Sequence, residues 1–285
     1  MTPSRLYVID HLDELYSHAI SVIIDCDKIG LSCEGKTLGR HGSLCWLAVC
    51  TDDAVFLFDI VCLGQEAFKY GLRTALQDKK IIKIVHDVRF IHDCLFGQFD
   101  IKLTNVFDTM IGDIVFLNQY AFGGFLPAFN RSLSTVLRDY LGIEDFHIFY
   151  PRYRRTHLAE DSAVWVERPS SISLLLGAAR NCLYLPALYR IVRKGTLLPF
   201  HHSCNVLKNF IKTRDAPDAA RAQLEMDELP RDVYENLPDW IQDTKAKVGK
   251  FYPTFGNFIA QNVSNPDPLC IFSKDSMHQS AYIAN

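Results

Sequence analysis

The sequence predicts an α/β domain with a mixed central sheet flanked by helices, and it places this domain over residues 6–195. Short apolar, β-prone segments are concentrated in the first 60 residues. A continuous Ile/Val run at residues 81–85 is typical of a strand covered on both faces. From residue 88 onward the apolar residues recur with helical spacing. The length of 285 residues allows one or two domains.

The individual elements follow from local patterns. The expected strands are residues 6–9, 28–33, 43–50, 54–60 and 81–85, and Thr51-Asp52-Asp53 predicts a hairpin between the third and fourth of them. Asp10 is a good N-cap for a helix over residues 12–22, with Asp13 and Glu14 in its first turn. The further expected helices are residues 67–77, 88–96, 109–119, 133–141 and 172–192.

Residues 196–285 predict a helical C-terminal extension, repeatedly broken by proline and ending in an irregular tail. No run approaches the roughly 18 consecutive apolar residues of a membrane helix, and no signal peptide precedes Asp10. We therefore expect no membrane association.

Charge and cysteine content limit the classes of function that this chain could have. The net charge of −3 excludes a protein that is basic over its entire surface, so a nucleic-acid site must be a local basic patch. Nine cysteines without a Cys-x-x-Cys pattern indicate reduced thiols in a cytosolic or nuclear protein. Zinc at Cys204 with His201 and His202 is conceivable, but no second Cys/His pair lies at a usable spacing, so we expect neither metal nor cofactor.

Several segments resemble the motifs of DEDD-type, RNase D-like 3′–5′ exonucleases, which have an RNase H-like fold. They are residues 34–44 for the first motif, 81–90 for the second, 106–109 for the following helix start and 177–185 for the last. Within this group the chain is similar to the exonuclease 3′–5′ domain-containing protein 1 family. Residues 40–47, 57–60, 86–89, 93–95, 184–186 and 228–230 carry that similarity. The family's longer members have an Lsm-like N-terminal domain, which we do not expect so close to residue 6.

The resemblance implies four carboxylates that hold two divalent ions for hydrolysis. The glycine pattern after the first motif places Ser32 and Glu34 in the site, so Ser32 replaces an aspartate. The competing register, with Asp25 and Asp27, begins seven residues too early, and we interpret these two as the polar end of the first helix.

The other motif positions have lost their acids. Ile91 stands at the second-motif aspartate, and neither Asp87 nor Asp93 lies on the helix where it could replace that aspartate. Gly177 and Asn181 stand at the last motif, where a water-positioning side chain and an aspartate are expected. We therefore predict a degenerate site without nuclease activity and without metal.

Three further polar residues have structural explanations that we prefer. Asp108, with Thr109, is expected to cap the following helix rather than to act in catalysis. His86, at the end of a buried strand, is expected to be a hydrogen-bonded core histidine. We expect Asp113 to face solvent on its helix.

A candidate RNA-binding patch interleaves arginine with tyrosine in the loop 150–157. Arginine can contact phosphates and tyrosine can stack on unpaired bases, although a solvated basic linker fits equally well. Lys36, Arg40 and Arg89 are expected at the rim of the former cleft. The candidate residues of the loop are Arg152, Tyr153, Arg154 and Arg155.

The family resemblance implies a non-catalytic, RNA-binding adaptor in PIWI-interacting RNA (piRNA) biogenesis. It also implies a homodimer, single-stranded RNA as ligand, a tudor-domain and PIWI-pathway protein partner, and a cytoplasmic location in perinuclear granules of germ cells. Two alternatives remain open: a weakly active metal-dependent 3′–5′ exoribonuclease, and a protein-only interaction scaffold.

Overall fold

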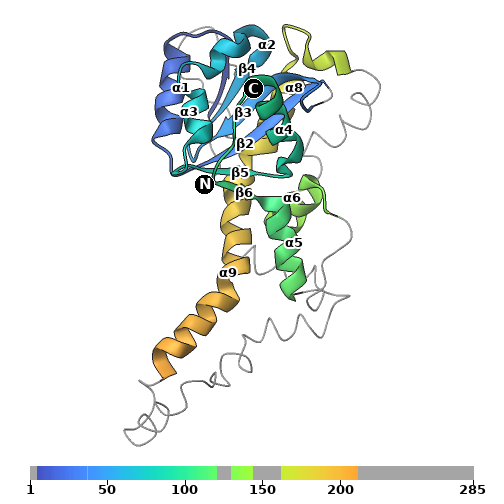
Figure 1. Ribbon diagram of the computed structural model, residues 1–285. Coiled ribbons are helices and arrows are strands. Elements are labelled where there is room, and N and C mark those ends of the chain that lie inside the picture. Colours follow the sequence, from blue (N-terminus) through green and yellow to red (C-terminus); the bar gives the residue numbers. More distant parts are fainter. Residues whose placement is uncertain (1–4, 37, 121–129, 144–161, 211–285) are drawn as a thin grey trace, which may run out of the picture.

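A computed structural model of the chain describes residues 5–36, 38–120, 130–143 and 162–210, and the side chains of these residues except 118–120, 162–163 and 198–210. The described residues form a mixed sheet in the order β1-β4-β3-β2-β5-β6 with helices on both faces, which confirms the expected fold class (Figure 1). The strands are β1 (Arg5–Ile9), β2 (Lys28–Lys36), β3 (Ser43–Cys50), β4 (Ala54–Asp59), β5 (Ile82–Val85) and β6 (Val106–Asp108).

The centre of the sheet is the antiparallel meander β2-β3-β4, and β1, β5 and β6 join it by parallel pairing. Successive side chains of a strand point to opposite faces. Leu31 and Cys33 of β2 therefore lie in the core on one face, whereas Gly30 packs against Cys182 and Leu185 on the other. This alternation divides the interior into two cores.

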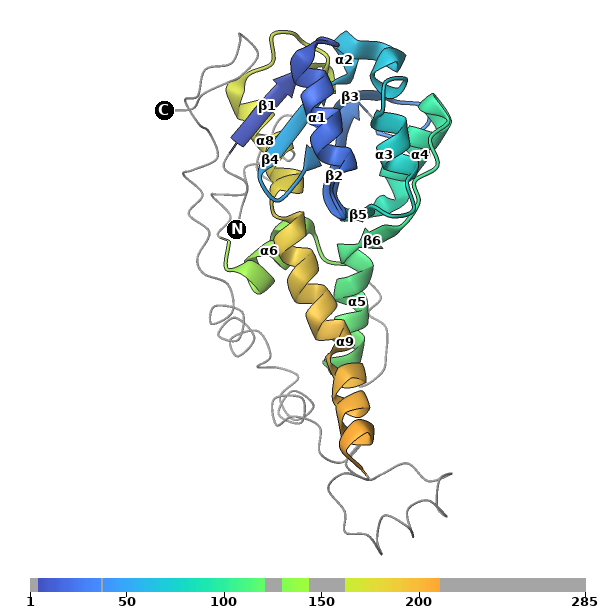
Figure 2. The same ribbon diagram turned by 90° about the vertical axis from the view of Figure 1, so that its left-hand side faces the viewer.

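Each core has its own set of helices, as the two views show (Figures 1 and 2). The first core lies under α1 (Glu14–Ile24), α2 (Ile60–Leu63), α3 (Leu72–Gln77), α4 (Val88–Phe99) and the 3₁₀ turn η1 (Gly64–Phe68). The second lies under α5 (Thr109–Tyr120), α6 (Leu133–Leu141), α8 (Ile172–Leu183), α9 (Leu185–Phe210) and the 3₁₀ turn η4 (Ser162–Trp165).

Three expected helices differ from the observed ones. The first expected helix is capped by Asp13, whose carboxylate accepts the Tyr16 N–H, so the prediction of Asp10 as the N-cap is wrong. The expected helix 67–77 is divided because Gly71 has a φ of 112°. The expected helix 172–192 ends at Leu183 and restarts at Leu185, since Pro186 supplies no N–H to continue the ladder.

Helix α9 packs along α5 and then continues beyond it (Figure 2). Glycines allow the close approach: a Cβ on Gly112 would lie 2.5 Å from Val192 Cγ1, and one on Gly195 would lie 2.3 Å from the Phe116 ring. The domain boundary expected at residues 195 and 196 lies inside this helix. Within the described residues, the segment Ile172–Leu197 is long and apolar enough to cross a membrane, but 67% of its 18-residue apolar window is buried inside the domain.

Candidate functional site

The centre of the candidate site is a contact between β2 and α8. The amide Nδ2 of Asn181 donates a hydrogen bond to Oε1 of Glu34 at 2.6 Å, joining residues 147 positions apart in the chain. Glu34 is only 6% exposed. A charge-assisted bond of this kind is short and strong, so the Asn181 amide holds the Glu34 carboxylate in place.

Two other expected site residues lie on the same side of the sheet. Ser32 is two residues before Glu34 on β2 and 8% exposed, and its hydroxyl has no hydrogen-bond partner among the described residues. Gly177 is buried on α8, one turn before Asn181. The structure therefore brings Ser32, Glu34, Gly177 and Asn181 to one face of the sheet.

A β-bulge between Glu34 and Gly35 sets the direction of the Glu34 side chain. Gly35 is opposite β3, and a Cβ at this position would lie 2.0 Å from the carbonyl oxygen of Ser43. Only glycine fits this close approach between two backbones.

The substitution Gly35→Ala is expected to cost at least about 1–3 kcal/mol of unfolding free energy, because the two strands must separate to admit the methyl group. Urea unfolding of this variant should be compared with that of Ser43→Ala, which trims an exposed side chain of the paired strand. Equal urea midpoints for the two variants would show that Gly35 is not required by the close approach of the strands.

The second-motif residues do not join this site. Ile91 is 6% exposed and packs in the core under α1 and α3, on the opposite face of the sheet. Asp87 caps α4 and accepts two bonds from the Arg89 guanidinium, at 2.6 and 2.7 Å. Asp93 binds Arg40 in the same way. These hydrogen bonds lower the pKa of both aspartates, and neither carboxylate is directed to Glu34 in place of the missing acid.

The expected basic rim is partly neutralised. Arg40 and Arg89 are exposed, yet each is paired with a neighbouring aspartate. Lys36 is exposed at the end of β2. The loop residues Arg152, Tyr153, Arg154 and Arg155 lie outside the described part of the chain.

Asp108 and His86 have structural roles at the end of β5 and β6. Asp108 accepts the N–H of Met110 at 2.9 Å and also the N–H groups of Asp87 and Val88, so it caps two helices at once. His86 Nδ1 lies 3.0 Å from Thr109 Oγ1, and Nε2 lies 3.2 Å from the carbonyl oxygen of Arg131. Both are the structural roles that the sequence predicts.

Burial lowers the pKa of His86 below the usual 6.5, against the carboxylates of Asp108, Asp113 and Asp87. The unfolded chain therefore takes up the proton first as the pH falls, and stability decreases below about pH 6.5. The urea midpoint should fall less between about pH 7.5 and 5.5 in His86→Gln than in the natural chain. His18→Gln, at an exposed histidine of α1, is the control, and parallel pH profiles for His86→Gln and the natural chain would refute the assignment.

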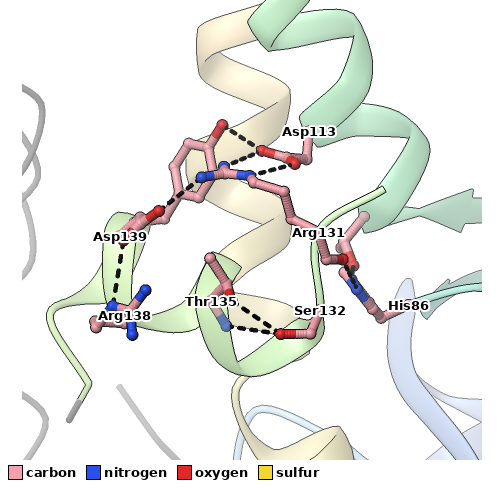
Figure 3. A network of polar contacts seen from close by, with 9 residues as sticks. His86, Asp113, Arg131, Ser132, Thr135, Arg138 and Asp139 are labelled. Carbon is pink, nitrogen blue, oxygen red and sulfur yellow. Dashed lines mark hydrogen bonds and ion pairs between the residues drawn. The ribbon is translucent and has the colours of Figure 1, made fainter. Parts of the chain in front are cut away.

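Asp113 is a buried residue, which corrects the expectation that it faces solvent. It is 1% exposed and binds the guanidinium of Arg131, which also donates to Asp139 at 2.6 Å (Figure 3). The hydroxyl of Tyr140 donates to Asp113 Oδ1 at 2.8 Å. Sequence reasoning missed this network because its partners come from α5 and from the start and the end of the 131–140 segment, and Asp113 and Arg131 are 18 positions apart.

A second buried ion pair was also missed. Arg168 donates to both carboxylate oxygens of Asp59, at 2.5 and 2.7 Å, and its guanidinium lies over the Trp46 ring at 4.5 Å. Asp59 is 2% exposed. The pair joins the end of β4 to the segment before α8, and so it fixes where α8 meets the sheet.

The donor set at Glu34 does not fit a pair of divalent ions. Magnesium needs hard oxygen ligands, and here the Glu34 carboxylate accepts an N–H from the Asn181 amide, while the neighbouring Ser32 supplies only a neutral hydroxyl. No group of three His, Cys, Asp or Glu residues within the described residues could hold a metal.

Comparison with known proteins shows which family the chain belongs to. The chain is 32% identical to the mouse "piRNA biogenesis protein EXD1" and 38% identical to its human counterpart, each over 86% of the chain. It spans 43% and 47% of the length of these two relatives. The similarity therefore concerns less than half of each relative.

Solved structures share the fold at low identity. RNase D of Trypanosoma brucei in complex with RNA U12 is 22% identical, with a TM-score of 0.55 over 66% of this chain and 62% of that one. The Nibbler EXO domain of Aedes aegypti is 16% identical, with a TM-score of 0.54 over 68% and 89% of the two chains. A sequence profile of 3′–5′ exonucleases matches residues 8–194. Because this profile matches more than half of the chain, the chain belongs to the 3′–5′ exonuclease domain family.

Proposed function

We propose that this chain is a catalytically inactive exonuclease-like domain that binds single-stranded RNA without shortening it, as an adaptor in piRNA biogenesis. The observation that carries the proposal is the Asn181–Glu34 hydrogen bond. Asparagine brings a neutral N–H donor to a position where two-ion hydrolysis needs a carboxylate.

The remaining positions support the absence of hydrolysis. The Ser32 hydroxyl is a neutral and weaker ligand than a carboxylate for a hard cation. Gly177 has no side chain that could position or deprotonate a water molecule, and the loss of such a group costs about 10²–10⁴ in rate. Ile91, at the position where the resemblance expects a further acid, packs in the core on the opposite face of the sheet and supplies no ligand.

Support for RNA binding and for the piRNA pathway comes from relatives and from local charge. The RNase D structure with RNA U12 shows that a protein of this fold can hold RNA. The curated relatives are named for piRNA biogenesis. Lys36, exposed at the end of β2, offers positive charge near the site, whereas Arg40 and Arg89 are exposed but paired with aspartates.

We extend the proposal to the assembly that the family resemblance implies. The chain forms a homodimer and binds a tudor-domain and PIWI-pathway protein in perinuclear granules of the germ-cell cytoplasm. Light scattering on the purified chain tests the dimer, and a mass equal to one chain would refute it.

One assay separates binding from hydrolysis. Labelled single-stranded RNA is incubated with the protein in Mg²⁺, in Mn²⁺ and in chelator, and both its mobility and its 3′ length are measured. Binding in all three conditions without shortening supports the adaptor.

Two results of this assay would overturn the adaptor proposal. Metal-dependent shortening that disappears in Glu34→Ala would indicate a residual exoribonuclease. Neither binding nor shortening would favour the protein-only scaffold. A matched variant, Glu66→Ala, removes an exposed acid far from the site and should behave as the natural chain does.

A further inference from the structure

The solvent side of α4 carries four flat side chains. They are Arg89, Phe90, His92 and Phe96, and we call them the α4 planar surface. Phe90 is 57% exposed and Phe96 is 44% exposed, although phenylalanine is among the residue types most often buried in proteins. Figure 2 shows α4 at one edge of the domain. These exposed rings contribute little to the core, so they are available for contact with a ligand.

The helix places three of these side chains in a row. Arg89, His92 and Phe96 follow one another at spacings of three and four residues, which puts them on one line along α4. This line is about 10 Å long, because each helical residue advances about 1.5 Å. The rings of His92 and Phe96 are nearly parallel, with an angle of 8° and centroids 6.0 Å apart. The ammonium group of Lys102, which follows α4, lies 5.7 Å from the centre of the Phe96 ring.

Ion pairs orient the arginines of this region and leave them exposed. Asp87 accepts two bonds from the Arg89 guanidinium, at 2.6 and 2.7 Å. Arg40, from the loop before β3, binds Asp93 of α4 through two of its nitrogens. Both arginine side chains remain more than half exposed. Such pairs use the N–H groups at the edge of the guanidinium plane, so the flat faces stay open for stacking.

A glycine inside α4 allows Arg40 to lie against the helix. A Cβ at Gly97 would lie 2.5 Å from the Cβ of Arg40 and 3.1 Å from its Cα. Glycine is less favourable than alanine in the interior of a helix. The sequence therefore has a costly residue at the position where an exposed arginine approaches α4. This contact extends the flat surface from α4 onto the loop before β3.

We propose that the α4 planar surface stacks against the unpaired bases of single-stranded RNA, and this inference rests on the RNA binding proposed above. Aromatic rings and guanidinium planes are the groups on which proteins stack unpaired bases. Such stacking tolerates any sequence, because every base has a flat face. It also supplies affinity that does not require a basic surface, in a chain whose net charge is −3.

Duplex RNA and a protein partner fit this surface less well. A duplex keeps its bases stacked inside and is recognised through its phosphates and 2′-hydroxyls. Arg40 and Arg89 are already paired with aspartates, so they attract phosphates weakly. A protein interface usually has a continuous apolar centre. Here Asp93 lies between Phe90 and Phe96 on the same side of α4, so the two rings do not form one apolar patch.

The test compares RNA with and without bases. Fluorescence anisotropy measures the binding of labelled oligoadenosine and of an abasic oligomer with the same number of phosphates. The natural chain should bind oligoadenosine more tightly. Loss of one stacking ring lowers affinity by about 5- to 140-fold. The variant Phe90→Ala/Phe96→Ala should therefore bind oligoadenosine at least about 10-fold more weakly, with its affinity for the abasic oligomer unchanged.

Two matched variants and one further measurement serve as controls. Phe90→Trp/Phe96→Trp retains flat faces and should keep the natural affinity. Tyr70→Ala removes an exposed ring that precedes α3, and it should also leave the affinity unchanged. Thermal unfolding verifies that each variant is folded. RNA that contains the fluorescent base 2-aminopurine tests the natural chain alone, because the emission of this base should fall when it stacks.

The outcomes distinguish this inference from the proposed function. A loss of affinity for oligoadenosine alone in Phe90→Ala/Phe96→Ala supports the role of α4. An unchanged affinity in this variant, or an equal loss for both oligomers, overturns that role and leaves RNA binding in place. A variant that keeps its RNA affinity but no longer has the mass of a dimer would make α4 a protein contact instead. A natural chain that binds neither oligomer overturns both the inference and the proposed RNA binding.

Discussion

Replacing Arg131 by methionine is expected to cost about 3–5 kcal/mol of unfolding free energy, because the substitution leaves a charge buried without its partner. The charge is that of Asp113, which is 1% exposed and bound by the guanidinium. Tyr140 also donates to this carboxylate, and burial together with Asp113 raises the pKa of its hydroxyl well above the usual value. One remaining donor cannot replace the lost positive charge.

The size of the effect depends on burial, and a surface pair shows this. Lys69 and Glu66 form an ion pair whose side chains are 61% and 46% exposed. Lys69→Gln should leave the urea midpoint close to that of the natural chain, because solvent screens an exposed pair. Urea unfolding measures the stability change of both variants, provided that their m-values equal that of the natural chain.

A third variant separates the buried charge from the loss of packing. Arg131→Met with Asp113→Leu removes both charges, and exchanging a buried ion pair for apolar residues is often close to neutral. The double variant should therefore be more stable than Arg131→Met alone. A double variant that is less stable than the single one would show that packing, and not the unpaired carboxylate, dominates.

The second large effect is expected at Asn181. The substitution Asn181→Asp replaces an N–H that donates to Glu34 at 2.6 Å with a second carboxylate. Loss of this hydrogen bond to a charged group costs about 1.5–3 kcal/mol, and repulsion between the two acids adds to it. In chelator the variant should unfold at a lower temperature than the natural chain.

Divalent metal should reverse this loss in the variant. Two adjacent carboxylates are hard ligands of the kind that Mn²⁺ and Mg²⁺ prefer, and binding to the folded state raises its stability by mass action. Asn181→Ala loses the same hydrogen bond without gaining a carboxylate, so its unfolding temperature should not respond to metal. A natural chain that is stabilised by Mn²⁺ as strongly as Asn181→Asp would contradict our interpretation of the site.

Much of the fold could be predicted because its signals are local. The run of apolar residues in β3 and the Ser132 cap before α6 each depend on neighbours within a few residues. Asp13 caps α1 in place of the expected Asp10, which lies about one turn earlier and is an equally suitable capping residue. Such choices are close in energy, so the sequence leaves them open.

The buried ion pairs could not be predicted, because each depends on residues far apart in the chain. The residues around Asp113 in the sequence do not indicate that it is buried. A buried carboxylate is costly unless it is paired, and its partner Arg131 comes from another segment. Arg168 and Asp59 are 109 residues apart, and neither has a local pattern that indicates the other.

By itself, the sequence determined the α/β class and the strands of the central meander, because side-chain types and their spacing carry that information. Only the tertiary structure decided which of these residues meet. Glu34 reaches Asn181 because α8 lies directly on β2, where Cys182 O would be 2.9 Å from a Cβ on Gly30. Ile91 is kept apart because α4 packs on the opposite face of the sheet. Contacts across 147 residues depend on how helices dock on the sheet, and that docking is set by the packing of both cores together.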